Sequence, residues 1–264
     1  MDEVHAHQDT EDQVFGDVVA LAWSAPWQWL GKGWRDMRAS WKLSGFFGAC
    51  FLGMAMVLVE VFRHSPEYTI SILSGCLLVG PFLALGLYEI SRQLEQGRRA
   101  TLAQVLLCWQ PHLASMGLLL LVLMVLELLW GRASLVVFAV FFNTGLPSDA
   151  SVLEALFNPD NWQFVLIYLL VAGVFATLVF CSMVVSIPMI LHRDTDAISA
   201  AITSFRVVLE NPGVMLGWAL LIVVLLGLAL LPFGLGLLVV GPLLGHASWH
   251  AYRAAVHWPP ANHP

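Results

Sequence analysis

The sequence predicts an all-α membrane protein, a polytopic bundle of about six transmembrane helices. Of the 264 residues, 59% are hydrophobic and only 11% are charged, whereas a soluble domain has roughly 25% charged residues. So few charges cannot cover a water-exposed surface. The apolar residues also gather into runs of about 20, the length of helix that crosses a hydrocarbon core. We therefore expect lipid to be the solvent for most of the chain.

Six apolar runs are the candidate transmembrane helices: residues 44–62, 69–88, 113–131, 163–190, 214–231 and 233–250. The third is ambiguous at its end, because apolar character resumes after Arg132 and continues to Phe142. Residues 132–142 can continue one long tilted helix or form a separate interfacial helix. We favour the interfacial helix, since Trp130 and Arg132 are typical of a membrane boundary.

The basic residues indicate the orientation, because cytoplasmic loops of membrane proteins are rich in Lys and Arg. With the N-terminus inside, the outer segments contain only Arg63 and Arg132, and the long outer loop 143–161 contains no cation. Ten basic residues lie on the cytoplasmic side: Lys32, Arg35, Arg38, Lys42, Arg92, Arg98, Arg99, Arg193, Arg206 and Arg253. Both termini are therefore expected in the cytoplasm.

The domain organisation follows from the same distribution. Residues 23–256 form the predicted membrane domain, and residues 257–264 a cytoplasmic tail. Residues 1–22 are rich in acids, and the first twenty contain no Lys or Arg. This composition predicts a solvated, disordered cytoplasmic tail, and we expect no cleavable signal peptide.

The six runs form three pairs with a common pattern, which suggests an internal repeat. An amphipathic segment precedes each pair, and a proline lies near the cytoplasmic end of each second span: Pro81, Pro188 and Pro242. Arg92 and Arg253 each follow the proline of their unit by eleven residues. A proline frees the carbonyl four residues before it, so we expect three helix-breaking prolines. The pattern predicts three pseudo-repeated pairs, each preceded by an interfacial helix.

The first amphipathic segment opens near Pro26. Its apolar residues follow the spacing of one helical face: Trp27, Leu30, Trp34, Met37 and Trp41. Four cations lie beside this stripe: Lys32, Arg35, Arg38 and Lys42. A helix of this kind is expected to rest on anionic lipid headgroups.

The other two segments have helix-start signals. Thr101 and Gln104 have the spacing of a capping box, and Asp194 or Thr195 can cap the third segment. The apolar stripe of the second is Leu102, Val105, Leu106 and Trp109, and that of the third is Ile198, Ile202, Phe205 and Leu209. Ordinary connector helices are the alternative interpretation.

No sequence motif for soluble enzyme chemistry or phosphate binding is present. Nucleic-acid binding is not expected either, because the cations follow the membrane. The remaining candidates are polar residues at membrane depth, which are costly there unless they are paired. Three sets follow the three prolines: Tyr88, Glu89 and Arg92; His192, Arg193 and Asp194; and His246, His250, Tyr252 and Arg253. We hypothesise that they converge into one cytoplasm-facing polar pocket.

Several of these residues have more than one interpretation. His246 and His250 share one helical face, so that both can bind a metal ion or one can bind a haem iron. We favour polar packing or headgroup contact at a helix end, and a proton- or substrate-handling role is a third alternative. Glu89 and Arg92 can form a simple interfacial ion pair. Glu127 can be a functional carboxylate inside the membrane or a structural partner of a cation.

Three stretches of the chain resemble an uncharacterised family of bacterial integral membrane proteins, domain of unknown function 2189. They are Pro81–Arg92, His192–Ala197 with Asn211-Pro212, and Pro242–Arg253, and the likeness covers roughly residues 28–256. The resemblance implies a bacterial inner-membrane location and a multi-span fold. It implies no established activity, substrate or cofactor.

These observations favour a non-enzymatic, multi-pass inner-membrane protein. We expect a transporter-like, accessory or assembly protein, for which the bilayer, its anionic headgroups and a protein partner or second copy are the candidate partners. The alternative is a haem- or metal-binding redox protein that uses His246 and His250. A cofactor is not required by the first hypothesis.

The orientation can be tested with reporter fusions. Fusions at Glu95, Phe205 and Trp258 should report a cytoplasmic location, and a fusion at Val152 an external one, because cations concentrate around the first three. A cytoplasmic signal from Val152 would overturn the predicted orientation.

Overall fold

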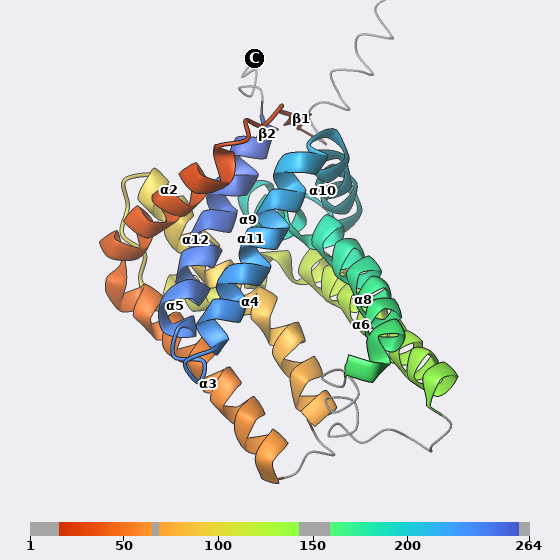
Figure 1. Ribbon diagram of the computed structural model, residues 1–264. Coiled ribbons are helices and arrows are strands. Elements are labelled where there is room, and N and C mark those ends of the chain that lie inside the picture. Colours follow the sequence, from red (N-terminus) through yellow and green to blue (C-terminus); the bar gives the residue numbers. More distant parts are fainter. Residues whose placement is uncertain (1–15, 65–68, 143–158, 259–264) are drawn as a thin grey trace, which may run out of the picture.

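The computed structural model describes residues 16–64, 69–142 and 159–258 (Figure 1). Its elements are, in chain order, β1 (Asp17–Val18), α2 (Ala25–Ala39), α3 (Trp41–His64), α4 (Thr69–Glu95), α5 (Leu102–Leu107), η2 (Gln110–His112), α6 (Leu113–Phe141), η3 (Pro159–Asn161), α8 (Trp162–Met183), α9 (Ser186–Arg193), α10 (Ala197–Glu210), α11 (Pro212–Leu230), α12 (Leu237–Ala255) and β2 (Val256–His257). The prediction of an all-α fold is confirmed, and the two short strands only pair with each other.

Four helical segments among the described residues are long and apolar enough to cross a membrane: Trp41–His64, Leu102–Phe141, Trp162–Arg193 and Pro212–Leu230. They contain the first, third and fourth predicted spans, and the fifth as far as Leu230. Part of the second predicted span lies outside the residues whose side chains are described. The sixth corresponds to α12, whose second half contains His246, His250 and Arg253. Six spans therefore stay a prediction.

The long helices pack as antiparallel neighbours. Phe138 of α6 contacts Phe164 of α8, while Trp130 contacts Phe175 further along the pair, each at 5.9 Å between ring centroids. α3 likewise packs on α4, and α11 on α12. Figure 1 shows α2, α9, α10 and the strands at the end of the bundle opposite the hairpin turns. We call this end the connector end and the other the hairpin end.

α12 is the helix around which α2, α3 and α4 pack. Small residues allow its close approaches. A Cβ at Gly33 of α2 would lie 2.8 Å from the backbone nitrogen of Ala247. A Cβ at Gly48 of α3 would overlap the carbonyl oxygen of Leu238, which is the carbonyl that Pro242 deprives of its helical donor. Glycine is thus required where α3 crosses the proline-weakened turn of α12.

The three prolines behave differently. α4 and α12 continue through Pro81 and Pro242, so the prediction that these two break their helices is wrong. Pro188 does accompany a break, because α8 ends at Met183 and α9 begins at Ser186. A proline is tolerated in the first turn of a helix, where its missing N–H has no intrahelical partner. The break therefore falls just before Pro188.

The separate interfacial helix favoured for residues 132–142 is not formed. α6 runs without interruption from Leu113 to Phe141. Its second half stays against α8, since the Ser134 hydroxyl donates to Tyr168 Oη at 3.2 Å and Phe138 packs on Phe164. These contacts extend the helix past Arg132, the residue at which the sequence suggested an end.

Residues near the N-terminus are more ordered than the tail prediction implies. β1 pairs antiparallel with β2, joining Asp17 to His257. Asn211 then accepts a hydrogen bond from the Leu21 backbone at 2.8 Å and donates to the Val19 carbonyl at 3.2 Å. The predicted disorder therefore does not extend over residues 17–22. Residues 1–15 lie outside the described part of the chain.

The amphipathic helices turn their bulky apolar faces outward. In α2, Trp29 is buried against Trp218, at 5.4 Å between ring centroids. Three tryptophans of the predicted stripe are exposed, Trp27 and Trp34 on α2 and Trp41 at the start of α3, at 66%, 40% and 68%. Leu30 of the same stripe packs against the core. The same holds for α10, whose Thr203, Ser204 and Val207 are buried while Ile198, Ile202 and Leu209 are exposed. Such outward apolar faces suit helices that lie against lipid.

The predicted helix caps are confirmed in one case and corrected in the other. Thr101 and Gln104 form the predicted capping box of α5. α10 is capped by Asp196, whose carboxylate accepts from the backbone N–H groups of Ile198 and Ser199 at 3.0 Å. Asp194, one of the two predicted caps, instead ends α9 in a left-handed conformation.

The close crossing at Gly48 yields a matched pair of variants. We expect Gly48→Ala to destabilise the protein by about 1–3 kcal/mol, the usual cost of overpacking, because the new methyl group overlaps the Leu238 carbonyl. Gly53 lies on the same helix with open space around it. Gly53→Ala should therefore be neutral or stabilising by up to about 1 kcal/mol. Thermal unfolding in detergent measures both, and equal effects would contradict the assigned crossing.

Candidate functional site

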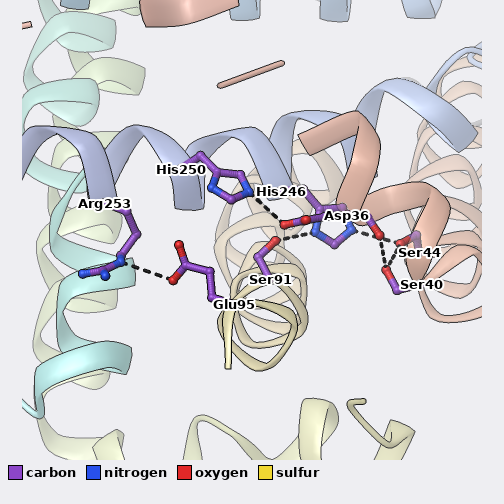
Figure 2. A network of polar contacts seen from close by, with 8 residues as sticks. All are labelled: Asp36, Ser40, Ser44, Ser91, Glu95, His246, His250 and Arg253. Atoms are coloured by element: carbon purple, nitrogen blue, oxygen red, sulfur yellow. Dashed lines mark hydrogen bonds and ion pairs between the residues drawn. The ribbon is translucent and has the colours of Figure 1, made fainter. Parts of the chain in front are cut away.

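His246 is the centre of a buried polar network (Figure 2). Its side chain is fully buried on α12, with Nε2 2.9 Å from the hydroxyl of Ser44 on α3 and Nδ1 2.8 Å from the hydroxyl of Ser91 on α4. A neutral imidazole donates through one nitrogen and accepts through the other, and a hydroxyl can do either. Both ring nitrogens are therefore satisfied without a charge in the protein interior.

Asp36 joins α2 to this network. Its Oδ2 lies 2.8 Å from His250 Nε2, one helical turn after His246, and both side chains are largely buried. Burial alone would raise the pKa of Asp36. The hydrogen bonds from His250 and Ser91 and the nearby imidazoles outweigh that effect, so the pKa of Asp36 lies below its ordinary value. The carboxylate is thus kept ionised and holds α2 against α12.

The contacts close into a circuit. Ser40, one turn after Asp36, donates to the Asp36 backbone carbonyl at 2.7 Å and lies 3.0 Å from the hydroxyl of Ser44. The path then returns through His246 and Ser91 to the Asp36 carboxylate. Three serine hydroxyls and a neutral His246 supply four hydrogens for these five contacts, so Ser40 and Ser44 are in contact without a hydrogen bond of their own. Four helices contribute to this circuit, and each of these groups has a partner. This arrangement is typical of a structural contact between helices rather than of a ligand-binding site.

The metal or haem hypothesis for His246 and His250 receives no support from this geometry. Hydroxyls occupy both nitrogens of His246, and Asp36 occupies Nε2 of His250. Within the described residues, no group of three His, Cys, Asp or Glu side chains could hold a metal ion.

Glu89 and Arg92 belong to the predicted set that follows Pro81, and the simple ion pair is confirmed. Arg92 donates to the two oxygens of Glu89 at 2.7 and 3.0 Å, and Gln93 donates to Glu89 at 2.7 Å. Glu89 is only 4% exposed. The third member, Tyr88, is buried in the core, where it bonds to Ser248.

This ion pair lies at the edge of a hollow of about 610 Å³ at the connector end, which we call the arginine hollow. It is lined by the end of α4, the following loop, α5, η2 and α9: Glu89, Arg92, Gln93, Arg98, Arg99, Ala103, Gln104, Leu107, Cys108, Pro111, His112 and Leu191. The lining includes three arginines and one carboxylate. The hollow is therefore positively charged and has one apolar side.

The predicted set that follows Pro188 lies beside Tyr252. His192 Nδ1 lies 2.8 Å from the Tyr252 hydroxyl, which also accepts from Trp258 Nε1 at 3.2 Å. The Arg193 guanidinium stacks on Trp258 at 4.8 Å. These contacts hold β2 and the end of α9 against α12, and they lie outside the arginine hollow.

The predicted sets thus occupy separate places rather than one lining. Arg253 pairs with Glu95 at 3.3 Å, and Asp194 contacts His112 at 2.7 Å. Among the residues predicted for the pocket, only Glu89 and Arg92 line the arginine hollow. Glu127 is half-buried in α6, and no contact joins it to Arg132 within the described chain.

Sequence reasoning missed several residues of both sites. Ser44 and Ser91 gave no signal, since a serine in a span is unremarkable. Asp36 did give a signal in the sequence, because it is the only acid between residues 23 and 59 and lies among the cations of α2. Arg98 and Arg99 were counted only for the orientation.

Comparison with known proteins gives a family assignment for part of the chain. Residues 69–192 match the model of the family described as predicted integral membrane protein, domain of unknown function 2189. This confirms the resemblance over α4 to α9, the segment that contains the arginine hollow, and identifies an integral membrane protein. No curated protein and no solved structure matches the chain.

The Asp36 contact predicts a pH-dependent stability. A lowered pKa in the folded state means that the carboxylate stabilises the fold above the pKa of the unfolded state, and that this stability is lost as the pH falls through the folded pKa. Asp36→Asn should lower the stability by about 2 kcal/mol at pH 7, and the difference from wild type should shrink below about pH 4.

Thermal unfolding of the detergent-solubilised protein between pH 2 and 8 is the measurement, because the pH must fall through the lowered pKa of Asp36. Glu210→Gln is the matched control, because Glu210 forms an exposed pair with Arg206 at 3.4 Å and such pairs contribute little. A loss for Asp36→Asn that is the same at every pH would refute an ionised Asp36 as its cause.

Proposed function

We propose that this is a non-enzymatic, multi-pass membrane protein, transporter-like or accessory, that binds an anionic ligand in the arginine hollow on the cytoplasmic side. One observation carries the proposal: a hollow large enough for a small ligand has Arg92, Arg98 and Arg99 in its walls. Six spans in three related pairs, an inner-membrane location and cytoplasmic termini belong to the same proposal.

The charge of the hollow is only partly compensated. Arg92 is neutralised by Glu89. Arg98 contacts the neutral amide of Gln96, and neither Arg98 nor Arg99 pairs with a carboxylate in the described chain. Guanidinium groups bind carboxylates and phosphates through two parallel hydrogen bonds. Two uncompensated arginines beside an apolar wall therefore favour an anion.

The distribution of cations supports a cytoplasm-facing hollow. The connector end carries the basic residues of α2, the α4–α5 loop, α9 and α10, as expected of a cytoplasmic face. α2 is suited to rest on anionic lipid headgroups there, because Arg38 lies over Trp34 at 5.2 Å and Lys42 over Trp41 at 5.6 Å. Lys32 and Arg35 extend the same basic surface.

The lining also favours binding over catalysis. Its carboxylate, Glu89, is already held by Arg92 and Gln93, and a base so bound is poorly placed to accept a proton from a substrate. The thiol of Cys108 points toward the Leu85 carbonyl at 3.9 Å. These contacts leave arginine side chains as the groups that can receive a ligand.

The proposal is tested by measuring the binding of sn-glycerol 3-phosphate to the purified protein. Replacement of Arg98 and Arg99 by glutamine should weaken binding about tenfold or more for each side chain, because a charge-assisted hydrogen bond contributes about 1.5–3 kcal/mol. Arg206→Gln is the control, since Arg206 lies on α10 outside the hollow. If the wild-type protein binds sn-glycerol 3-phosphate and the Arg98→Gln and Arg99→Gln variants bind it equally well, the proposed site is refuted.

A further inference from the structure

An apolar groove lies next to the arginine hollow. It is lined by α4, α6 and the α8–α9 junction, and its walls include Phe82 and Leu85, Met116 and Leu119, and Met183 and Ile187. All of its lining side chains are apolar. It is a narrow groove of about 20 Å³, which is room for about one water-sized group.

The hollow and the groove share their walls at successive helical turns. On α4, Leu85 of the groove lies one helical turn before Glu89 of the hollow. Leu191 is related in the same way to Ile187 on α9. On the third wall His112 precedes Met116. A turn is about 5.4 Å along the axis, so the α4 and α6 walls change from polar to apolar over the same short depth, whereas Leu191 and Ile187 make the α9 wall apolar throughout.

The direction of this change is the same on the α4 and α6 walls. α4 approaches the connector end as its residue numbers rise, while α6 leaves it, so Glu89 and His112 lie nearer the connector end than Leu85 and Met116. A polar hollow above an apolar groove matches the order of headgroup and acyl chain in a bilayer.

We infer that the two cavities form one site for an anionic phospholipid, with its phosphate against Arg98 and Arg99 and one acyl chain along the groove. This inference rests on the proposed function of the hollow and names its ligand class. The groove is too narrow to enclose a chain, so the chain lies along its open side.

The rim of the hollow fits a ligand that arrives from the bilayer. Leu107 lines the hollow and is 49% exposed, while its neighbours Leu106 and Leu113 are 43% and 57% exposed. The rim is therefore apolar where α5 leads into α6. A soluble anion gains nothing from such a rim, whereas a lipid keeps its chain in apolar surroundings while its headgroup moves onto the arginines.

The headgroup charge determines the expected preference. Lipids with the same acyl chains make the same contacts in the groove, so the arginines determine the preference among headgroups. A phosphate monoester carries about −1.5 to −2 charges at neutral pH, which matches two uncompensated guanidinium groups. Phosphatidic acid should therefore bind more tightly than phosphatidylglycerol, and phosphatidylcholine most weakly.

Native mass spectrometry of the protein released from mixed micelles, with the three lipids at equal mole fraction, is the test. Bound phosphatidic acid should exceed phosphatidylcholine about tenfold or more. Leu120→Trp, which fills the groove, should reduce that binding and leave the binding of sn-glycerol 3-phosphate unchanged. Leu121→Trp is the control, because Leu121 is exposed and lies outside the groove.

A phosphatidic acid with a photoreactive diazirine in its acyl chain provides a readout that does not depend on the groove variant. Crosslinks should map to residues 116–123 and 183–187. Crosslinks elsewhere, or equal binding of the three lipids, would overturn the lipid inference. If the protein still bound sn-glycerol 3-phosphate, the proposed function would stand. If the wild-type protein bound neither phosphatidic acid nor sn-glycerol 3-phosphate, both the lipid inference and the proposed function would be refuted.

Discussion

The bilayer offers no water to a buried polar group, so a polar side chain inside this bundle is costly unless it has a partner within the protein. The circuit through Asp36, Ser40, Ser44, Ser91 and His246 satisfies this constraint. Its members come from α2, α3, α4 and α12, and none of them can lose its neighbour without leaving a buried donor or acceptor unpaired. The relative positions of these four helices depend on that requirement.

Packing at the same helices follows from the circuit. Hydrogen bonds of 2.8–2.9 Å around His246 require close backbones, and Gly33 and Gly48 make that approach possible. The carbonyl freed by Pro242 then faces Gly48 rather than lipid. Small residues and hydrogen bonds between helices are the forces available for association in a membrane, where the hydrophobic effect does not act between helices. Here the two kinds of contact coincide on α12.

The arginine hollow is separate from the circuit around His246. Its walls belong to α4, the α4–α5 loop, α5, η2 and α9, and only α4 takes part in both sites. α4 places Ser91 in the circuit and Glu89 and Arg92 at the hollow. The circuit and the hollow therefore meet on one helix, α4.

The sequence alone determined the class of the protein, and it identified one helix cap and one ion pair. Composition and apolar runs predicted an all-α membrane protein, and the Thr101–Gln104 capping box and the Glu89–Arg92 pair were readable because their partners are three residues apart. Periodicity also identified the apolar stripes of α2 and α10. Tertiary structure decided the rest. Asp36 meets His250 from 214 residues away, and no local pattern specifies such a contact. α6 continues past Arg132 because Ser134 and Phe138 contact α8. Whether a proline breaks a helix was likewise decided by its neighbours, since Pro242 is accommodated by Gly48 while Pro188 begins a new helix. A residue's type limits the contacts that it can make, and only the folded chain brings the partner within reach.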